Sequence, residues 1–179
     1  EGLVTMRDHL ERMNFKLALG ATHRPVKEIS VEIDVATGSI TMTNDGDGID
    51  VVMHPTEGIY VPELIFFHPL TGTNFEDNDD RTWGGRNGYG SKLISICSTE
   101  CTIETVDYNR KLKYVQTCQN NMRDIMPPII TACRTLPYTR ITFKPDLKYF
   151  SLESLNSYDH IPLFHKRVID IAACTAKTV

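Results

Sequence analysis

Apolar residues occupy every second position over residues 29–35 and again from Ile40 to Met42, with a polar turn over residues 36–39 between the two runs. This alternation predicts a hairpin of two strands, each with one buried face. Further strands are predicted over residues 100–106, 111–117 and 138–144. Apolar residues at helical spacing predict helices over residues 1–13, 61–67, 90–98, 152–155 and 160–173.

The order of these elements indicates the α/β (α+β) class. The connections between strands are too short for a parallel doubly wound sheet, so we expect a two-layer sandwich of a mixed, largely antiparallel sheet with helices on one face. The length of 179 residues fits one domain, residues 1–179. The aperiodic stretch 68–88 carries an acidic run and is expected to be an exposed loop.

Composition narrows the possible functions. Apolar residues make up 41% and charged residues 23% of the chain, which is ordinary for a globular protein, and no run of 18 apolar residues predicts a membrane helix. The net charge of −4 argues against a domain that binds DNA mainly through its phosphates. The five cysteines include no Cys-x-x-Cys pair, and we expect them to be reduced thiols.

Four glycines lie within residues 84–90, directly before a predicted helix that carries Lys92. Glycine allows close approach of a backbone to a ligand, and the free N–H groups of a helix start suit phosphate. The spacing is not that of a Walker A loop, because Ser91 precedes Lys92, nor that of a Rossmann fingerprint, because Leu93 replaces the third glycine. A phosphate-binding lid and a plain flexible loop both fit the residues themselves.

A second polar segment, residues 44–48, follows the predicted strand that ends at Thr43. Its Asp and Gly residues partly resemble a calcium-binding EF-hand loop, but Ile49 and Thr56 stand where that loop needs ligands. A carboxamide at the end of a strand has another use, since Asn44 could hydrogen-bond the edge of an adenine while the glycines let the base approach. An Asn that merely caps a tight turn fits equally well.

These two segments, in this order, resemble the GHKL ATPases, which comprise gyrase, the Hsp90 chaperones, the histidine kinases and the MutL proteins. A narrower resemblance is to the ATP-binding domain of eukaryotic-type (type IIA) DNA topoisomerases II, and it runs from Glu1 to about Thr175. Five blocks carry it, namely residues 60–66, 70–75, 84–93, 116–122 and 139–146.

The resemblance implies a role for individual residues. Glu1 would polarise the water that attacks the γ-phosphate, Lys92 would face the phosphates, and Thr5 stands where the family has its Mg²⁺-binding Asn. The residues implied in nucleotide binding are Asn44, Ile49, Ile65, Phe66, Thr73, Asn74, Arg86, Asn87, Gly88, Tyr89, Gly90, Lys92, Thr139 and Ile141. Without the resemblance, Glu1 is a helix-start carboxylate, Lys92 a solvated lysine, and the apolar members ordinary core residues.

The chain departs from the family pattern at Gly2, Thr5 and His9 in the first helix and at Gly72. These departures concern metal binding and hydrolysis more than the adenine pocket. They keep open a degenerate nucleotide-binding or interaction module that does not hydrolyse ATP. Another GHKL ATPase, MutL-like or Hsp90-like, is the other alternative.

The resemblance also implies a larger machine. We expect the chain to be a fragment of an ATP- and Mg²⁺-dependent homodimeric enzyme that passes one DNA duplex through a break in another. An N-terminal strap, a transducer domain and a DNA-cleavage core would lie elsewhere in that enzyme. A cellular enzyme of this kind would act in the nucleus, and a viral one in the host cytoplasm or nucleus.

Overall fold

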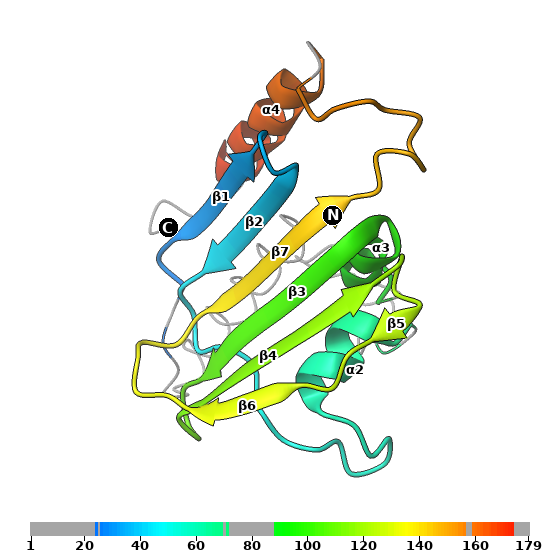
Figure 1. Ribbon diagram of the computed structural model, residues 1–179. Helices are drawn as coiled ribbons and strands as arrows, with labels where there is room; N and C mark the ends of the chain where they lie inside the picture. Colours follow the sequence, from blue (N-terminus) through cyan, green and yellow to red (C-terminus); the bar gives the residue numbers. More distant parts are fainter. Residues whose placement is uncertain (1–23, 25, 70, 72–87, 157–158, 174–179) are drawn as a thin grey trace, which may run out of the picture.

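The computed structural model describes Arg24, residues 26–69, Thr71, residues 88–156 and residues 159–173. Within these residues a single seven-stranded sheet has the order β1-β2-β7-β3-β4-β5, and β6 pairs with β4 beside β5 (Figure 1). Its strands are β1 (Ile29–Asp34), β2 (Ser39–Asn44), β3 (Ser98–Asp107), β4 (Leu112–Gln119), β5 (Asp124–Ile125), β6 (Ile129–Ala132) and β7 (Thr139–Pro145). Every pairing among them is antiparallel, which confirms the largely antiparallel sheet.

The alternation seen in the sequence sets which face of the sheet is buried. Ile40, Met42 and Asn44 point to the buried face of β2, whereas the residues between them are only partly covered. On the other face, the hydroxyl oxygens of Thr41 and Thr142 lie 3.1 Å apart across β2 and β7. One face is therefore covered and mostly apolar, and the opposite face is polar.

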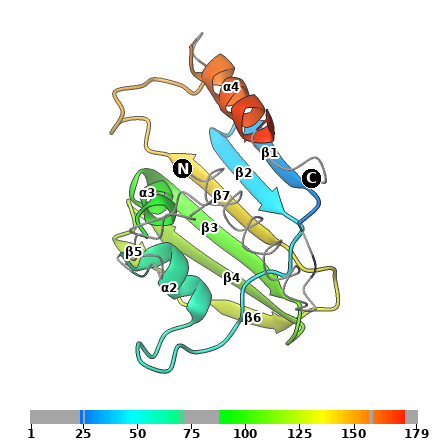
Figure 2. The ribbon, with the colours of Figure 1, turned by 180° about the vertical axis from the view of Figure 1, so that it is seen from behind.

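Two short helices, α2 (Val61–Phe67) and α3 (Gly90–Ile96), cover the buried face behind β3 and β4 (Figures 1 and 2). The core cluster comprises Met42, Phe66, Phe67, Ile94, Cys101, Ile103, Cys118 and Ile141. The third described helix, α4 (His160–Ala173), lies beside β1 at the other end of the sheet, as both views show. Among the described residues, no helix is long and apolar enough to cross a membrane.

Most predicted elements are confirmed, and one is wrong. Residues 152–155 form bends rather than a helix, and the backbone N–H of Leu152 donates to the carbonyl of Leu147 in a turn. A stretch of four residues cannot nucleate a helix without tertiary support. The sequence also did not predict β5 and β6, which are two and four residues long. The helix expected over residues 1–13 lies outside the described residues.

Candidate functional site

The loop after β2 carries the first part of the candidate site. Asn44 ends β2 with 3% of its surface exposed, and its carboxamide oxygen accepts a hydrogen bond from the N–H of Gly46 at 3.4 Å. Asp45 accepts hydrogen bonds from the N–H groups of Lys27 and Glu28 at 2.7 and 2.9 Å. The carboxylate of Asp45 therefore holds the loop against the segment before β1.

Gly48 fixes how closely this loop approaches the sheet. Its φ is +78°, and a Cβ built there would lie 2.0 Å from the carbonyl oxygen of Val106. Only glycine fits such a position. The close approach lets the N–H of Ile49 donate to the hydroxyl of Thr105 at 2.9 Å.

Two buried threonines continue from this contact. The hydroxyl of Thr105 lies 3.1 Å from the carbonyl of Tyr138 and 3.1 Å from the hydroxyl of Thr139. If Thr105 gives its single proton to Tyr138, then Thr139 donates to Thr105, and a lone pair of Thr139 stays available as an acceptor. The sequence had not singled out Thr105, and its position on the inward face of a strand was the only signal for it.

The sheet brings Asn44 and Thr139 together although 95 residues separate them. They are directly opposed partners in the antiparallel pairing of β2 with β7, so their side chains share the inner face. Ile141, two residues further along β7, is in the core cluster with Phe66, and Ile49 and Ile65 pack against that cluster. Six of the residues implied in adenine binding thus lie on the covered side of the sheet, and two of them, Phe66 and Ile141, are also core residues.

Asp107 anchors the other end of the same loop. Its carboxylate is buried and accepts hydrogen bonds from the N–H groups of Val51, Asn109 and Arg110 at 2.9, 2.8 and 3.0 Å. Burial alone would raise the pKa of Asp107, but hydrogen bonds from the backbone of Arg110 and Val51 and from the Arg110 guanidinium hold it below its usual value. This residue was also missed, because its contact with Val51 joins two segments that lie 56 residues apart in the sequence.

Lys92 is the most unusual ionisable group of the second part of the site. Only 3% of its surface is exposed, and its Nζ donates to the hydroxyl of Thr71 at 2.9 Å. Burial lowers the pKa of Lys92 to about 8. Among the described residues no carboxylate pairs with it, since none of the ion pairs there includes Lys92. Lys92 is thus not the solvated lysine of the alternative interpretation.

The contacts of α3 place Lys92 beside α2. The hydroxyl of Ser91 donates to the carbonyl of Ile65 at 2.9 Å, and Thr71, the partner of Lys92, lies 3.0 and 3.1 Å from the carbonyls of Leu64 and His68. Gly88, in the left-handed region at φ +68°, and the half-exposed Tyr89 lead into Gly90, the first residue of α3. The predicted lid residues Gly88, Tyr89 and Gly90 therefore lie at the α3 end of the site.

Several predicted site residues lie outside the described residues and stay predictions: Glu1, Thr5, Thr73, Asn74, Arg86 and Asn87. Among the residues that are described, no group of three or more His, Cys, Asp or Glu side chains could hold a metal ion. A metal here would depend on oxygens from a ligand and from residues outside the described ranges.

Comparisons with known proteins agree with this geometry. The chain is 49% identical to DNA topoisomerase 2 of Arabidopsis thaliana over 152 residues, which are 84% of this chain and 10% of that protein. It is 48% identical to DNA topoisomerase 2 of Acanthamoeba polyphaga mimivirus over 147 residues, which are 82% of this chain and 12% of that protein. The chain therefore spans about a tenth of the length of these curated relatives. No protein-family model matches it.

Solved structures show the same similarity. The ATPase region of Saccharomyces cerevisiae topoisomerase II matches with a TM-score of 0.84 and 42% identity, over 94% of this chain and 42% of that one. The ATPase and transducer domains of Balamuthia mandrillaris DNA topoisomerase II match with a TM-score of 0.86 and 41% identity, over 97% and 43%. The 43K ATPase domain of Thermus thermophilus gyrase B, at 20% identity and a TM-score of 0.63 over 93% and 38%, shares the fold. The fold is thus that of the GHKL ATPases, and the chain belongs to the DNA topoisomerase II family, with its similarity in the ATPase region.

Proposed function

We propose that this chain binds ATP for a type II DNA topoisomerase, which uses ATP to pass one DNA duplex through a double-strand break in another. The observation that carries the proposal is the pairing of Asn44 with Thr139 on the buried face, beside the loop that Gly48 holds against β3. The similarity to solved ATPase regions of topoisomerase II supports it.

Each side chain of this part of the site suits one feature of an adenine. The Asn44 carboxamide offers both donors and an acceptor, as the N6 and N1 edge of adenine requires, and the hydroxyl of Thr139 adds an acceptor. Ile49 and Ile65 are only partly buried and offer apolar surface to the base. The hydrogen bond from Gly46 uses only one lone pair of the Asn44 oxygen, so the amide keeps capacity for a ligand.

Lys92 suits the triphosphate. A cation buried without a carboxylate partner among the described residues is costly, and a phosphate group would supply the missing charge. Bound phosphate would also restore the pKa of Lys92 towards its ordinary value, so that nucleotide binding takes up a proton near pH 8.

Hydrolysis would depend on residues outside the described ranges. Glu1 is proposed as the group that orients and deprotonates the attacking water. Mg²⁺ would be held mainly by the phosphates and water, with at most one contact from Thr5, and it would neutralise charge on the phosphates. Most contacts with DNA are assigned to other parts of the enzyme, because the chain itself carries a net charge of −4. Homodimerisation is likewise proposed for the whole enzyme.

A titration with a non-hydrolysable ATP analogue tests the proposal. Trp83 is the only tryptophan and immediately precedes the glycine-rich segment, so its fluorescence can report binding. Asn44→Ala should weaken binding by roughly 5- to 150-fold, which corresponds to the loss of about 1–3 kcal/mol of hydrogen bonding. Asn109→Ala, in the exposed turn after β3, is the matched control and should bind as the unmodified chain does.

Two outcomes would contradict the proposal. A folded chain that binds no analogue at millimolar concentration would exclude this pocket. Unchanged affinity in Asn44→Ala, together with a lower melting temperature, would show that Asn44 only caps the turn through its bond to Gly46.

A second candidate is a nucleotide-binding module without hydrolysis, which the Thr5 and His9 departures in the first helix favour. The two candidates differ in turnover, not in binding. Metal-dependent ATPase activity of a longer protein that includes the transducer domain would decide for the enzyme.

A further inference from the structure

The turn that joins β4 to β5 has an unusual backbone. Asn120, Asn121 and Met122 are three consecutive residues with positive φ, at +53°, +59° and +64°. Residues with a side chain rarely adopt this left-handed conformation in succession, although Asn tolerates it better than Met. Such a run persists only where surrounding contacts impose it, and strained backbone of this kind is often found at functional sites.

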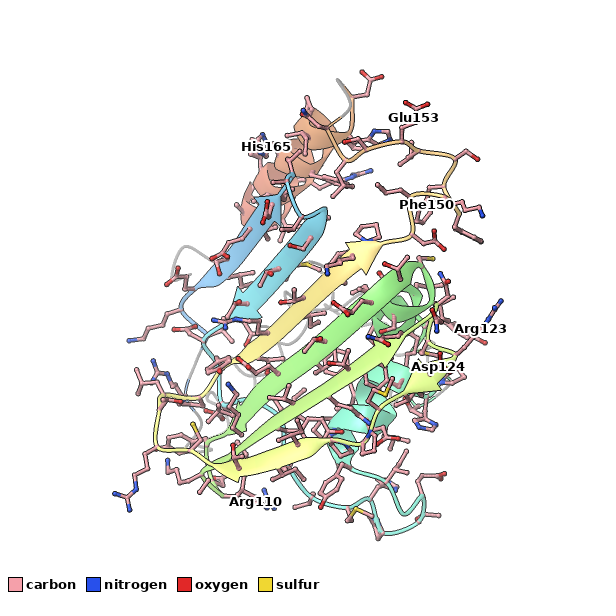
Figure 3. All side chains as sticks on the ribbon, in the orientation of Figure 1. Arg110, Arg123, Asp124, Phe150, Glu153 and His165 are labelled. Carbon is pink, nitrogen blue, oxygen red and sulfur yellow. The ribbon has the colours of Figure 1, made fainter. Side chains whose placement is uncertain are left out.

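The contacts that impose it come from the start of β3 and from the core. The N–H groups of Asn120 and Asn121 donate to the carbonyls of Thr99 and Ser98 at 3.0 and 3.1 Å. The side chain of Met122 packs against the core cluster. The turn is thereby fixed beside the C-terminal end of α3. Figure 3 labels Arg123 and Asp124, which follow the three residues, at one end of β4, and Arg110 at the other end.

The side chain of Asn121 joins two elements that are far apart in sequence. Its Nδ2 donates to the carbonyl of Ile96, the last residue of α3, at 3.0 Å and to the carboxylate of Asp146 after β7 at 3.1 Å. The N–H of Asp146 donates to the carbonyl of Cys97 at 2.9 Å. Asn121 and Asp146 together satisfy carbonyls that a helix end otherwise leaves without partners.

The helix held in this way is the one that carries Lys92. At seven residues, α3 is too short to be stable alone, so its place depends on the packing of Ile94 in the core cluster and on the contacts at its ends. Its first turn is tied to α2 through Ser91, and its last residue is tied to the β4–β5 turn through Asn121. Lys92 lies four residues before Ile96, about one helical turn away, on the segment between these two ties.

We propose that Asn121 is a positioning residue for the triphosphate, because it fixes the end of α3 and thereby the place of the Lys92 ammonium. This inference rests on the proposed function of Lys92. It assigns a role to a residue of the sequence block 116–122. None of the residues implied in adenine binding or in the lid belongs to that block.

The chain offers a matched control in Asn120. Both Asn residues have left-handed backbones, so replacement by glycine relieves strain in each, but the exposed Asn120 side chain donates only within its own turn, to Asp124. Binding of a non-hydrolysable ATP analogue and of adenosine is measured for Asn121→Gly, Asn121→Asp and Asn120→Gly, along with melting temperature. Hydrogen exchange of the amides of residues 92–97 gives a readout that does not depend on a ligand.

Both Asn121 variants should bind the ATP analogue roughly tenfold more weakly, with adenosine affinity within about twofold of the unmodified chain. Exchange over residues 92–97 should become faster, while exchange in β4 and β3 should not change. Asn120→Gly should match the unmodified chain in both affinities and in exchange over residues 92–97, and its melting temperature should not fall.

Three results would overturn the inference. They are equal loss of affinity for both ligands, unchanged affinity for the ATP analogue, and the same behaviour in Asn120→Gly as in Asn121→Gly. If the unmodified chain binds neither ligand, the proposed function and the triphosphate role fall together, and exchange over residues 92–97 still decides whether Asn121 holds α3.

Discussion

Gly48→Ala tests how the loop after β2 is held against the sheet. A Cβ at this position would lie 2.0 Å from the Val106 carbonyl oxygen and 3.1 Å from the hydroxyl of Thr105. The first contact is with the backbone of Val106, which pairs with Lys113 of β4 near the end of β3 and cannot move aside. The loop must therefore withdraw, and the hydrogen bond from Ile49 to Thr105 at 2.9 Å would be lost.

The size of the effect follows from three contributions. The left-handed φ of +78° costs an alanine about 1–2 kcal/mol more than glycine. Loss of the Ile49 hydrogen bond costs about 1 kcal/mol, and overpacking a closed site costs about 1–3 kcal/mol. The free energy of unfolding should fall by about 3–6 kcal/mol, a large share of the 5–15 kcal/mol that a domain typically has.

Gly38→Ala and Gly58→Ala are matched controls for this measurement. Both glycines have similar positive φ, +69° and +67°, but a Cβ at either would meet nothing within 4 Å. They should lose only the backbone contribution of about 1–2 kcal/mol. Urea unfolding of the four proteins, followed by circular dichroism, gives the comparison directly.

The same variants separate a folding effect from a binding effect. Gly48→Ala should also lose most affinity for an ATP analogue in conditions where it is still folded, whereas the two controls should keep theirs. A Gly48→Ala protein that unfolds at the same urea concentration as Gly38→Ala would refute the close approach. It would show that the loop can move away from β3 at no cost.

Three other predictions concern single groups. Lys92→Met should raise the free energy of unfolding at pH 7, since it removes a buried cation, and should weaken triphosphate binding. The pKa of Lys92 in the folded chain is about 8, below the ordinary 10.5, so the free energy of unfolding of the unmodified chain should rise between these pH values. Urea titrations across that range should therefore show a shrinking advantage of the variant. Asp107→Asn should lower the free energy of unfolding at pH 7 by about 2 kcal/mol. Because the pKa of Asp107 is lowered in the folded state, its contribution to stability is complete above the unfolded pKa of 3.8 and is lost as the pH falls through the folded pKa. In an acid titration the variant should therefore lose stability less steeply than the unmodified chain. In a longer enzyme, Glu1→Gln should reduce ATPase turnover by a factor on the order of 10²–10⁴ while nucleotide still binds, whereas Thr5→Asn should keep or raise turnover. Steady-state ATPase assays with supercoiled DNA measure both variants, and full activity of Glu1→Gln would contradict the prediction.

The sheet was predictable where its strands are long and half buried. In β1 and β2 apolar and polar residues alternate, and each strand ends at a turn with its own chemistry. In the turn between β1 and β2 the carboxylate of Asp34 accepts hydrogen bonds from the N–H groups of Ala36 and Thr37, and Gly38 supplies the residue with a left-handed backbone. Here local pattern, turn residues and tertiary burial all favour the same structure.

Other parts could not be predicted because nothing local determines them. The strands β5 and β6 are too short to show a period, and they exist because both pair with the free edge of β4. The roles of Thr105, Asp107 and Asn121 depend on partners 25 to 56 residues away along the chain. When only the sequence is known, a residue of this kind can equally well be explained as an ordinary turn residue or core residue with no role in the site.

The two ends of the candidate site differ in how they are held, and this difference bears on how ATP could act. Asn44 and Thr139 belong to central strands, whose positions are fixed by pairing on both sides. Lys92 belongs to a seven-residue helix that is fixed by the packing of Ile94 in the core cluster and by hydrogen bonds at its two ends. Moving α3 breaks these few hydrogen bonds and the packing of one core residue, whereas moving β7 breaks two ladders, so we expect the phosphate side to have the lower local stability. An adenine would therefore bind to a rigid surface, and the charge of the triphosphate would act on the part of the site that costs least to move.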